Sequence, residues 1–142
     1  MTIQLVLTLF VAFQVKHFVA DYPLQGRFML GKFRQDWGFV LPLLAHVGVH
    51  AVGTFLIVCW FGIAQAVCLA IFDAIIHFLM DRVKASKRYL GRFKLLTADT
   101  APTASPAQWR SNTFFWWSLG LDQAVHHFTH YAVIAYVLWR LT

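Results

Sequence analysis

The sequence contains no glutamate, and charged residues of either sign make up only 13% of its 142 residues. A water-soluble domain carries roughly twice that charged fraction. Cysteine is also scarce: Cys59 and Cys68 both lie in hydrophobic segments and lack CxxC spacing. Neither a disulfide framework nor a thiolate zinc site is therefore indicated. We interpret both cysteines as small buried apolar residues.

Hydrophobic residues make up 59% of the chain and occur in long blocks. Four blocks, at Ile3–Ala20, Phe39–Phe61, Ile63–Met80 and Thr113–Leu141, are long enough to cross a bilayer. A single glycine separates the second block from the third, which requires these two helices to be antiparallel neighbours. The sequence predicts an all-α, polytopic membrane protein. Four transmembrane helices would form one antiparallel bundle, a single domain over residues 1–142.

The connections between these blocks are strongly basic. The first and third connections carry three and seven Lys and Arg residues, and the second carries none. The positive-inside rule then places both basic connections in the cytoplasm and both termini in the periplasm. The stretch Arg82–Lys94 is typical of an amphipathic helix lying on anionic lipid, and Thr97–Gln108 of a mobile loop. Lys16, near the end of the first block, is expected to snorkel to the interface.

Histidine and aspartate recur at four-residue spacing in every hydrophobic block. Residues four apart lie on the same face of an α-helix, so each series forms a polar stripe on an apolar helix. The predicted topology puts all four stripes at overlapping depth near the cytoplasmic side. The ten stripe residues are His17, Asp21, His46, His50, Asp73, His77, Asp81, Asp122, His126 and His130. His127 falls off the stripe by about one residue's rotation.

Such stripes are costly to bury unless something binds them. Imidazole and carboxylate ligands without cysteine favour Zn, Mn or Fe as the divalent metal. Ten groups fit two ions with four to six ligands each, or one ion whose histidines are oriented by hydrogen bonds to aspartates that do not bind the ion. A proton or ion relay without fixed metal is the main alternative, because such relays also use Asp and His inside the bilayer.

An open coordination position on the metal would activate water, with Asp21 or Asp81 as the general base. The basic connections favour an anionic substrate, either a lipid phosphate or a nucleotide, which Lys32, Lys84 or Arg88 would hold. Membrane lipids are the expected partners, and no nucleic-acid recognition motif is present. The sequence also leaves open a homo-oligomer in which a second copy of the chain completes the site.

Two further functions stay open. One is a non-enzymatic role, in ion or proton transport or as a phage membrane effector. The other is a di-iron oxygenase, because His46-x3-His50 and His126-His127-x2-His130 loosely resemble the histidine boxes of membrane desaturases. The third box of those enzymes is missing here.

The blocks KHFVADYPLQ (16–25), IIHFLMDRVK (75–84) and LDQAVHHFTHY (121–131) resemble the signature blocks of a family of small bacterial and phage membrane proteins. That family is labelled only as a domain of unknown function, and its pattern also features Gln25, Lys32 and Gln123. The resemblance implies four helices, a bacterial inner membrane (or the host's, if phage-encoded), and a binding role for those residues. The spacing is distantly similar to that of membrane-bound metal-dependent hydrolases.

Overall fold

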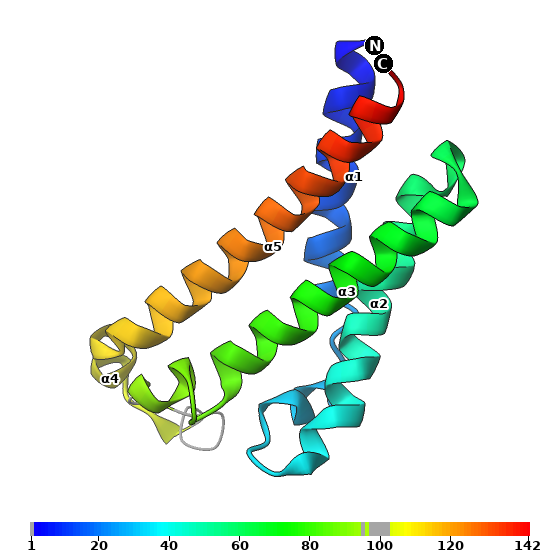
Figure 1. Ribbon diagram of the computed structural model, residues 1–142. Coiled ribbons are helices and arrows are strands. Elements are labelled where there is room, and N and C mark those ends of the chain that lie inside the picture. The colour runs from blue at the N-terminus through cyan, green and yellow to red at the C-terminus, as the bar shows by residue number, and fades with distance from the viewer. Residues whose placement is uncertain (1, 95, 97–102) are drawn as a thin grey trace.

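The computed structural model of the protein describes residues 2–94, 96 and 103–142 (Figure 1). The described residues form helices joined by turns and irregular connections, with no strand among them. The long helices are α1 (Ile3–Asp21), α2 (Val40–Val58), α3 (Ile63–Ala85) and α5 (Thr113–Arg140). Shorter elements are η1 (Met29–Phe33), η2 (Trp37–Phe39), η3 (Cys59–Phe61), η4 (Leu90–Phe93) and α4 (Pro106–Ser111). The all-helical prediction is thus confirmed.

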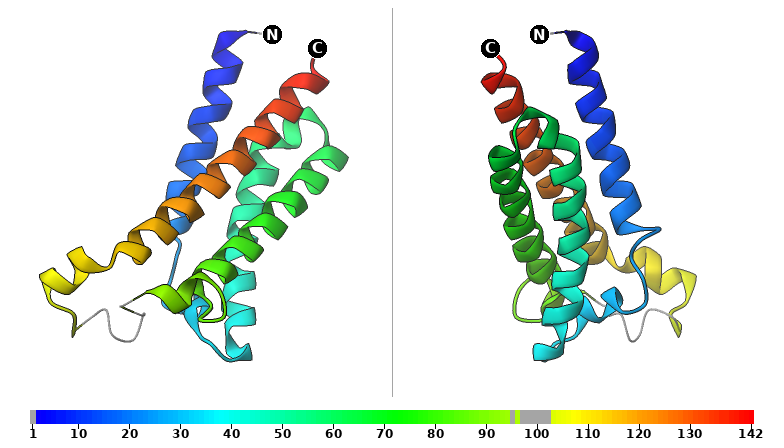
Figure 2. Two further views of the ribbon diagram at one scale, coloured as in Figure 1. Left: turned by 60° about the vertical axis from the view of Figure 1, so that its left-hand side comes forward. Right: turned by 90° about the vertical axis from the view of Figure 1, so that its right-hand side faces the viewer.

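The helices pack in a closed circuit. α1 contacts α2 and α5, and α3 contacts the same two helices from the other side. Both chain termini lie at one end of the molecule, whereas α4 and the connection from α1 to α2 lie at the other (Figures 1 and 2). The end with the termini is closed by a hydrophobic cluster from all four long helices, namely Leu9, Phe13, Val58, Ala66, Val133, Ile134 and Val137. The buried polar side chains therefore lie in the middle and toward the opposite end.

The turn between α2 and α3 is as short as the sequence predicts. Gly62 alone separates η3 from α3, and its φ of +136° is one that residues with a Cβ rarely adopt. At the other end, α3 continues to Ala85, beyond the predicted limit at Met80. Because of this extra length, Asp81 and Lys84 belong to α3 and lie on the same face of the helix as Asp73 and His77.

The prediction of an amphipathic helix over Arg82–Lys94 is wrong. Its first four residues belong to α3, and only Leu90–Phe93 is helical after that, as a short 3-10 turn. The chain doubles back here because the Gly91 N–H donates to the Ser86 carbonyl at 3.0 Å. A Cβ on Gly91 would lie 2.7 Å from that carbonyl oxygen, so this close approach needs glycine. Of the predicted loop Thr97–Gln108, residues 97–102 lie outside the described residues, and Pro106 begins α4.

Burial is inverted relative to a water-soluble protein. Large aliphatic side chains such as Val15, Val52 and Ile75 are more than half exposed, whereas five histidines are among the largest fully buried side chains. In water this arrangement would be unfavourable, because apolar surface is the part normally removed from solvent. An apolar exterior around a polar interior is what a lipid environment favours.

Three described stretches, Ile3–Asp21, Trp37–Phe61 and Ile63–Phe93, are long and apolar enough to cross a membrane. These stretches indicate a membrane protein. α5 is longer, with 28 residues, but does not reach the same mean hydropathy. Its inward-facing Asp122, His126 and His130 and its tryptophans lower that mean.

Candidate metal centre

The four predicted stripes meet inside the helices. Nine of the ten stripe residues are less than 5% exposed, and the tenth, Asp21, is partly exposed at the end of α1. α1 contributes His17 and Asp21, and α2 contributes His46 and His50. The others come from α3 and α5. The structure thus brings together residues that are more than 100 positions apart in the sequence.

One group of potential metal ligands consists of Asp21, His46, His50 and His77, from three helices. One ligand atom from each lies within 4.8 Å of the others. The Asp21 carboxylate is the centre of this group: its Oδ1 is 3.1 Å from His50 Nε2 and 3.4 Å from His46 Nε2. Three imidazoles and one carboxylate suit a divalent transition metal.

A second group consists of Asp81 from α3 and Asp122 and His126 from α5, again within 4.8 Å of one another. His126 Nε2 is 3.2 Å from Asp122 Oδ1, one helical turn away. The second group adjoins the first. His46 Nε2 lies 3.3 Å from Asp81 Oδ2, and the ring of His77 stacks on that of His126 with centroids 3.6 Å apart. The two groups together can hold one ion or two neighbouring ions.

Many nitrogens of this interior have no hydrogen-bond partner. His77 is 1% exposed, and neither of its ring nitrogens has one. The same holds for both ring nitrogens of His46 and His126 and for Nδ1 of His17, His50 and His130. Leaving a buried polar group unpaired costs roughly 1–3 kcal/mol. A metal ion bound by His46, His77 or His126 would pair one unpartnered nitrogen of each ring, so these residues fit a metal centre.

Asp73 and His130 belong to neither group, because Lys16 engages them. Lys16 Nζ lies 2.7 Å from Asp73 Oδ2 and 3.1 Å from His130 Nε2. Thr54 also donates to Asp73 Oδ2, at 2.6 Å. The prediction that Lys16 snorkels to the interface is wrong: the residue is 9% exposed and its ammonium points into the protein. Its only sequence signal is its position directly before a stripe histidine.

His17 also lies outside both groups, although it touches one of them. Its Nε2 is 3.2 Å from Asp21 Oδ2 and 3.0 Å from the amide oxygen of Gln123. The amide nitrogen of Gln123 donates to Asp122 at 3.3 Å, which fixes the orientation of the amide. His17 Nε2 is then the donor to the Gln123 oxygen. Gln123 therefore links His17 with the second group, in a position to orient ligands.

Lysines surround the carboxylates of the second group. Lys84 Nζ is 2.6 Å from Asp122 Oδ2 and 2.9 Å from Asp81 Oδ1, and Lys32 Nζ is 2.8 Å from Asp81 Oδ2. Among the described residues no lysine or arginine forms an ion pair with Asp21. The first group is therefore the one whose charge is left for a bound cation.

A cavity of about 180 Å³, which we call the vestibule, opens beside these lysines. It is lined by Asp21, Gln25, Lys32, Lys84, Lys94 and Gln123, together with Tyr22, Phe33, Phe115, Ser118 and Leu119. Four of the five predicted substrate-binding residues are in this lining. The fifth, Arg88, is exposed and does not line the vestibule. Lys94 was missed by sequence reasoning, because its place depends on the turn after α3.

Two of the vestibule lysines, Lys32 and Lys94, lie outside the candidate membrane-crossing stretches, and the pKa of each is lowered. Burial lowers the pKa of Lys32, although the nearby Asp81 opposes this effect. Burial, reinforced by the charge of Lys84, lowers the pKa of Lys94 to about 8. Lys94 Nζ donates to the Lys84 carbonyl at 2.8 Å, which keeps it at the vestibule wall.

The family model described as "Protein of unknown function (DUF3307)" matches residues 9–142. No curated protein and no solved structure matches the chain. The expected family of unknown function is thereby confirmed, and the match covers all ten stripe residues and the five predicted substrate-binding residues. The chain belongs to the DUF3307 family.

Proposed function

We propose that the protein is a membrane metalloenzyme that hydrolyses the phosphoester of an anionic lipid. The observation that carries this proposal is the position of the vestibule. Its wall contains Asp21 of the first ligand group, together with Lys84, which contacts both carboxylates of the second group. One potential metal ligand and the lysines that could bind a phosphate thus line the same small cavity, an arrangement that suits a phosphoester hydrolase.

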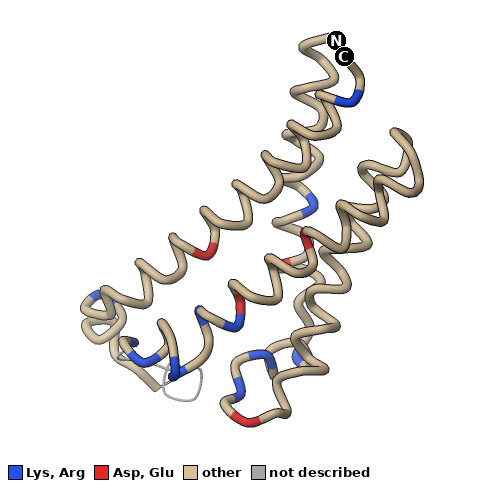
Figure 3. The backbone as a smooth tube through the Cα atoms, in the orientation of Figure 1, with Lys and Arg blue, Asp and Glu red and all other residues tan. Residues whose placement is uncertain are grey.

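The proposal includes four membrane spans, with α5 as the fourth. α5 contacts α1 and α3, and its own polar stripe is buried. Lysine and arginine gather at the end opposite the termini (Figure 3). The positive-inside rule would place that end, with the vestibule, at the cytoplasmic face of a bacterial inner membrane.

The first ion belongs in the Asp21, His46, His50 and His77 group, where no lysine competes for the carboxylate. Zn, Mn and Fe all suit this donor set. A second ion in the other group would have to displace Lys84 from Asp81 and Asp122. A phosphate in the vestibule would favour that displacement, because it offers the Lys84 ammonium another anionic partner.

Bound metal would supply Lewis acidity and would make a bound water more acidic. The chain's own residues would do the rest. Water adds to phosphorus, the ester P–O bond breaks, and the products are the lipid alcohol and inorganic phosphate. Asp81 or Asp21 would take the proton that the water loses and return it to the leaving oxygen of the lipid alcohol. Lys84 and Lys94 would neutralise the phosphoryl oxygens. Gln25 and Gln123 would hydrogen-bond the same group.

An ion or proton pathway is less well supported. It would need a polar route from the vestibule to the opposite end of the helices. Beyond Asp73 the interior is filled by the hydrophobic cluster of Phe13, Val58, Val133 and their neighbours. A site open from one side favours a binding or catalytic role.

The first test is elemental analysis of the protein purified in mild detergent, compared with His77→Ala and His127→Ala. His127 lies one residue from His126 and belongs to neither ligand group, so its variant is the matched control. We expect about one or two equivalents of Zn, Mn or Fe in the wild type and the control, and loss in His77→Ala. Wild-type protein without metal after incubation with each ion would contradict the proposal.

The second test measures inorganic phosphate released from phosphatidic acid by the metal-loaded protein. Release should depend on the metal, stop with a chelator and fall in Lys84→Met. A metal-loaded protein that releases no phosphate would retain the metal site and refute the enzymatic role for this lipid class.

A further inference from the structure

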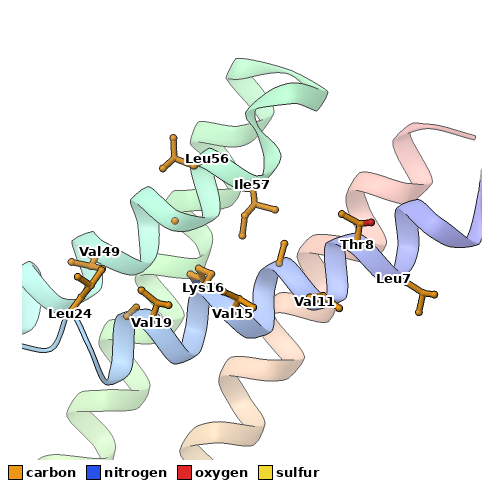
Figure 4. Close-up of a pocket in the computed structure, with 13 residues that line it drawn as sticks. Leu7, Thr8, Val11, Val15, Lys16, Val19, Leu24, Val49, Leu56 and Ile57 are labelled. Atoms are coloured by element: carbon orange, nitrogen blue, oxygen red, sulfur yellow. The ribbon is translucent and has the colours of Figure 1, made fainter.

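A second, much larger cavity lies on the outer side of α1 and α2. It is a groove of about 740 Å³, within the roughly 300–1,000 Å³ range of small-molecule sites. Figure 4 shows the lining residues Val11, Val15 and Val19 along α1 and Leu56 and Ile57 on the neighbouring α2. Thr8 and Lys16 are the only polar side chains in its lining, and the Lys16 ammonium is engaged by Asp73. The groove therefore presents hydrocarbon almost throughout.

The groove ends beside the vestibule. Val19 and Ala20 line the groove, and the next residues, Asp21 and Tyr22, line the vestibule. The turn after α1 repeats this division, since Leu24 faces the groove and Gln25 the vestibule. A 3.0 Å hydrogen bond from the Leu24 N–H to the Val19 carbonyl holds that turn against the helix. One continuous ligand can thus lie along the apolar wall and reach the polar cavity.

The length of the groove fits a long hydrocarbon chain. Along α1 it extends from Leu7 to Ala20, about 20 Å at 1.5 Å per residue. One leaflet of a bilayer core is about 15 Å deep, half of the roughly 30 Å core. A chain that enters at the vestibule can therefore lie in the groove over at least the depth of its own leaflet.

We propose that the groove between α1 and α2 binds the hydrocarbon chain of a lipid phosphate whose headgroup occupies the vestibule. This inference rests on the proposed function and assigns its substrate to the membrane rather than to water. The charges support a lipid phosphate over a second protein helix. Lys32, Lys84 and Lys94 line the vestibule at one end, and the groove itself offers a partner no polar side chain other than Thr8 and the engaged Lys16.

The test uses phosphatidic acid with a diazirine in one acyl chain, in phosphatidylcholine nanodiscs that contain the full chain. Ultraviolet cross-linking and peptide mapping should place the label on α1 and α2 around Val15 and Ile57. Ile75 of α3, similarly exposed to lipid at 53%, should be labelled far less. Excess unlabelled phosphatidic acid should remove the label, whereas glycerol 3-phosphate, inorganic phosphate and diacylglycerol should not.

A matched pair of variants tests the groove itself. Val15→Trp fills it, and Val52→Trp adds the same ring on α2 outside it; the two valines are 55% and 59% exposed. Val15→Trp should lower the labelling by about tenfold, because several methylenes lose their contacts. Val52→Trp should leave it unchanged.

Several outcomes would overturn the inference. Equal labelling of all lipid-facing helices would indicate ordinary surrounding lipid, and a cross-linked dimer through this face would indicate a second copy. If glycerol 3-phosphate or inorganic phosphate competed as strongly as phosphatidic acid, the hydrocarbon chain would have no role in binding.

Labelling needs no turnover and is measured beside the metal content. If the groove is labelled but the protein holds no metal, lipid binding is upheld and the hydrolase proposal fails. If the protein holds metal but the groove is not labelled, the metal site is upheld and the lipid-binding inference fails.

Discussion

Lys16 Nζ and Asp73 Oδ2 lie 2.7 Å apart in the interior, where both side chains are almost completely buried. The pair joins α1 to α3, and its carboxylate also accepts from Thr54 of α2 at 2.6 Å. Lys16 reaches Asp73 beside Gly53: a Cβ on that glycine would lie 2.7 Å from Lys16 Cγ. Three helices therefore meet at one ion pair, on the side of the metal ligands toward the hydrophobic cluster.

Removal of one partner of this pair should destabilise the protein strongly. Lys16→Met leaves a buried aspartate without its cation, a change that costs about 3–5 kcal/mol in comparable buried pairs. Lys16→Met/Asp73→Asn leaves no charge and should recover much of that loss. Thermal unfolding in one detergent measures both, with the exposed Lys87→Met as control. A double variant no more stable than Lys16→Met would show that the pair is not what holds these helices.

The two glycines Gly48 and Gly53 of α2 should respond differently to alanine. A Cβ at Gly48 meets nothing within 4 Å, so Gly48→Ala should stabilise the helix by up to about 1 kcal/mol. Gly53→Ala places its methyl against the Lys16 stem, and such overpacking typically costs about 1–3 kcal/mol. Thermal unfolding of the two variants provides the comparison. Equal effects would mean that Lys16 moves aside without cost.

Gln123 should affect metal affinity without being a ligand. It accepts from His17 and donates to Asp122, and loss of such orienting partners typically lowers metal affinity by about 10–100-fold. We expect Gln123→Ala to bind the same number of ions with that weaker affinity, as measured by competition with a zinc chelator. Gln14→Ala is the matched control, because Gln14 contacts His127 outside both ligand groups. Unchanged affinity in Gln123→Ala would remove this role.

The sequence predicts well which polar residues are buried in the interior. It predicts less well which partner each of them contacts there. Four-residue spacing identifies one face of a helix, so all ten stripe residues could be found without a structure. Which of the ten residues join the first ligand group, which join the second and which join neither depends on how each helix is shifted and rotated against its neighbours. Local spacing in the sequence does not encode that arrangement. Lys16 is one such case: one residue's rotation from His17 suggests a lipid-facing side chain, but α2 approaches closely enough at Gly53 to bury it. Lys94 is another, because a turn closed by Ser86 and Gly91 brings it to the vestibule.

Lys94 should make stability depend on pH in a defined range. Its pKa falls from 10.5, the ordinary value, to about 8 in the folded protein because burial and Lys84 disfavour the ammonium. Between pH 8 and 10.5 the unfolded chain therefore binds more protons at this position than the folded chain, so stability rises with pH. Below pH 8 both states carry the proton, and the full penalty for the buried charge remains.

The matching variant is Lys94→Met, which removes the charge but keeps the apolar stem. Below pH 8 the difference between its thermal midpoint and that of the wild type should be constant, because Lys94 carries its proton in both the folded and the unfolded wild type. This constant difference should then shift in favour of the wild type as the pH rises from 8 to 10.5. Comparing two proteins at each pH cancels every other group that titrates in both. A difference that stays flat over this range would show that Lys94 keeps an ordinary pKa, and that its ammonium is solvated rather than held at the vestibule wall.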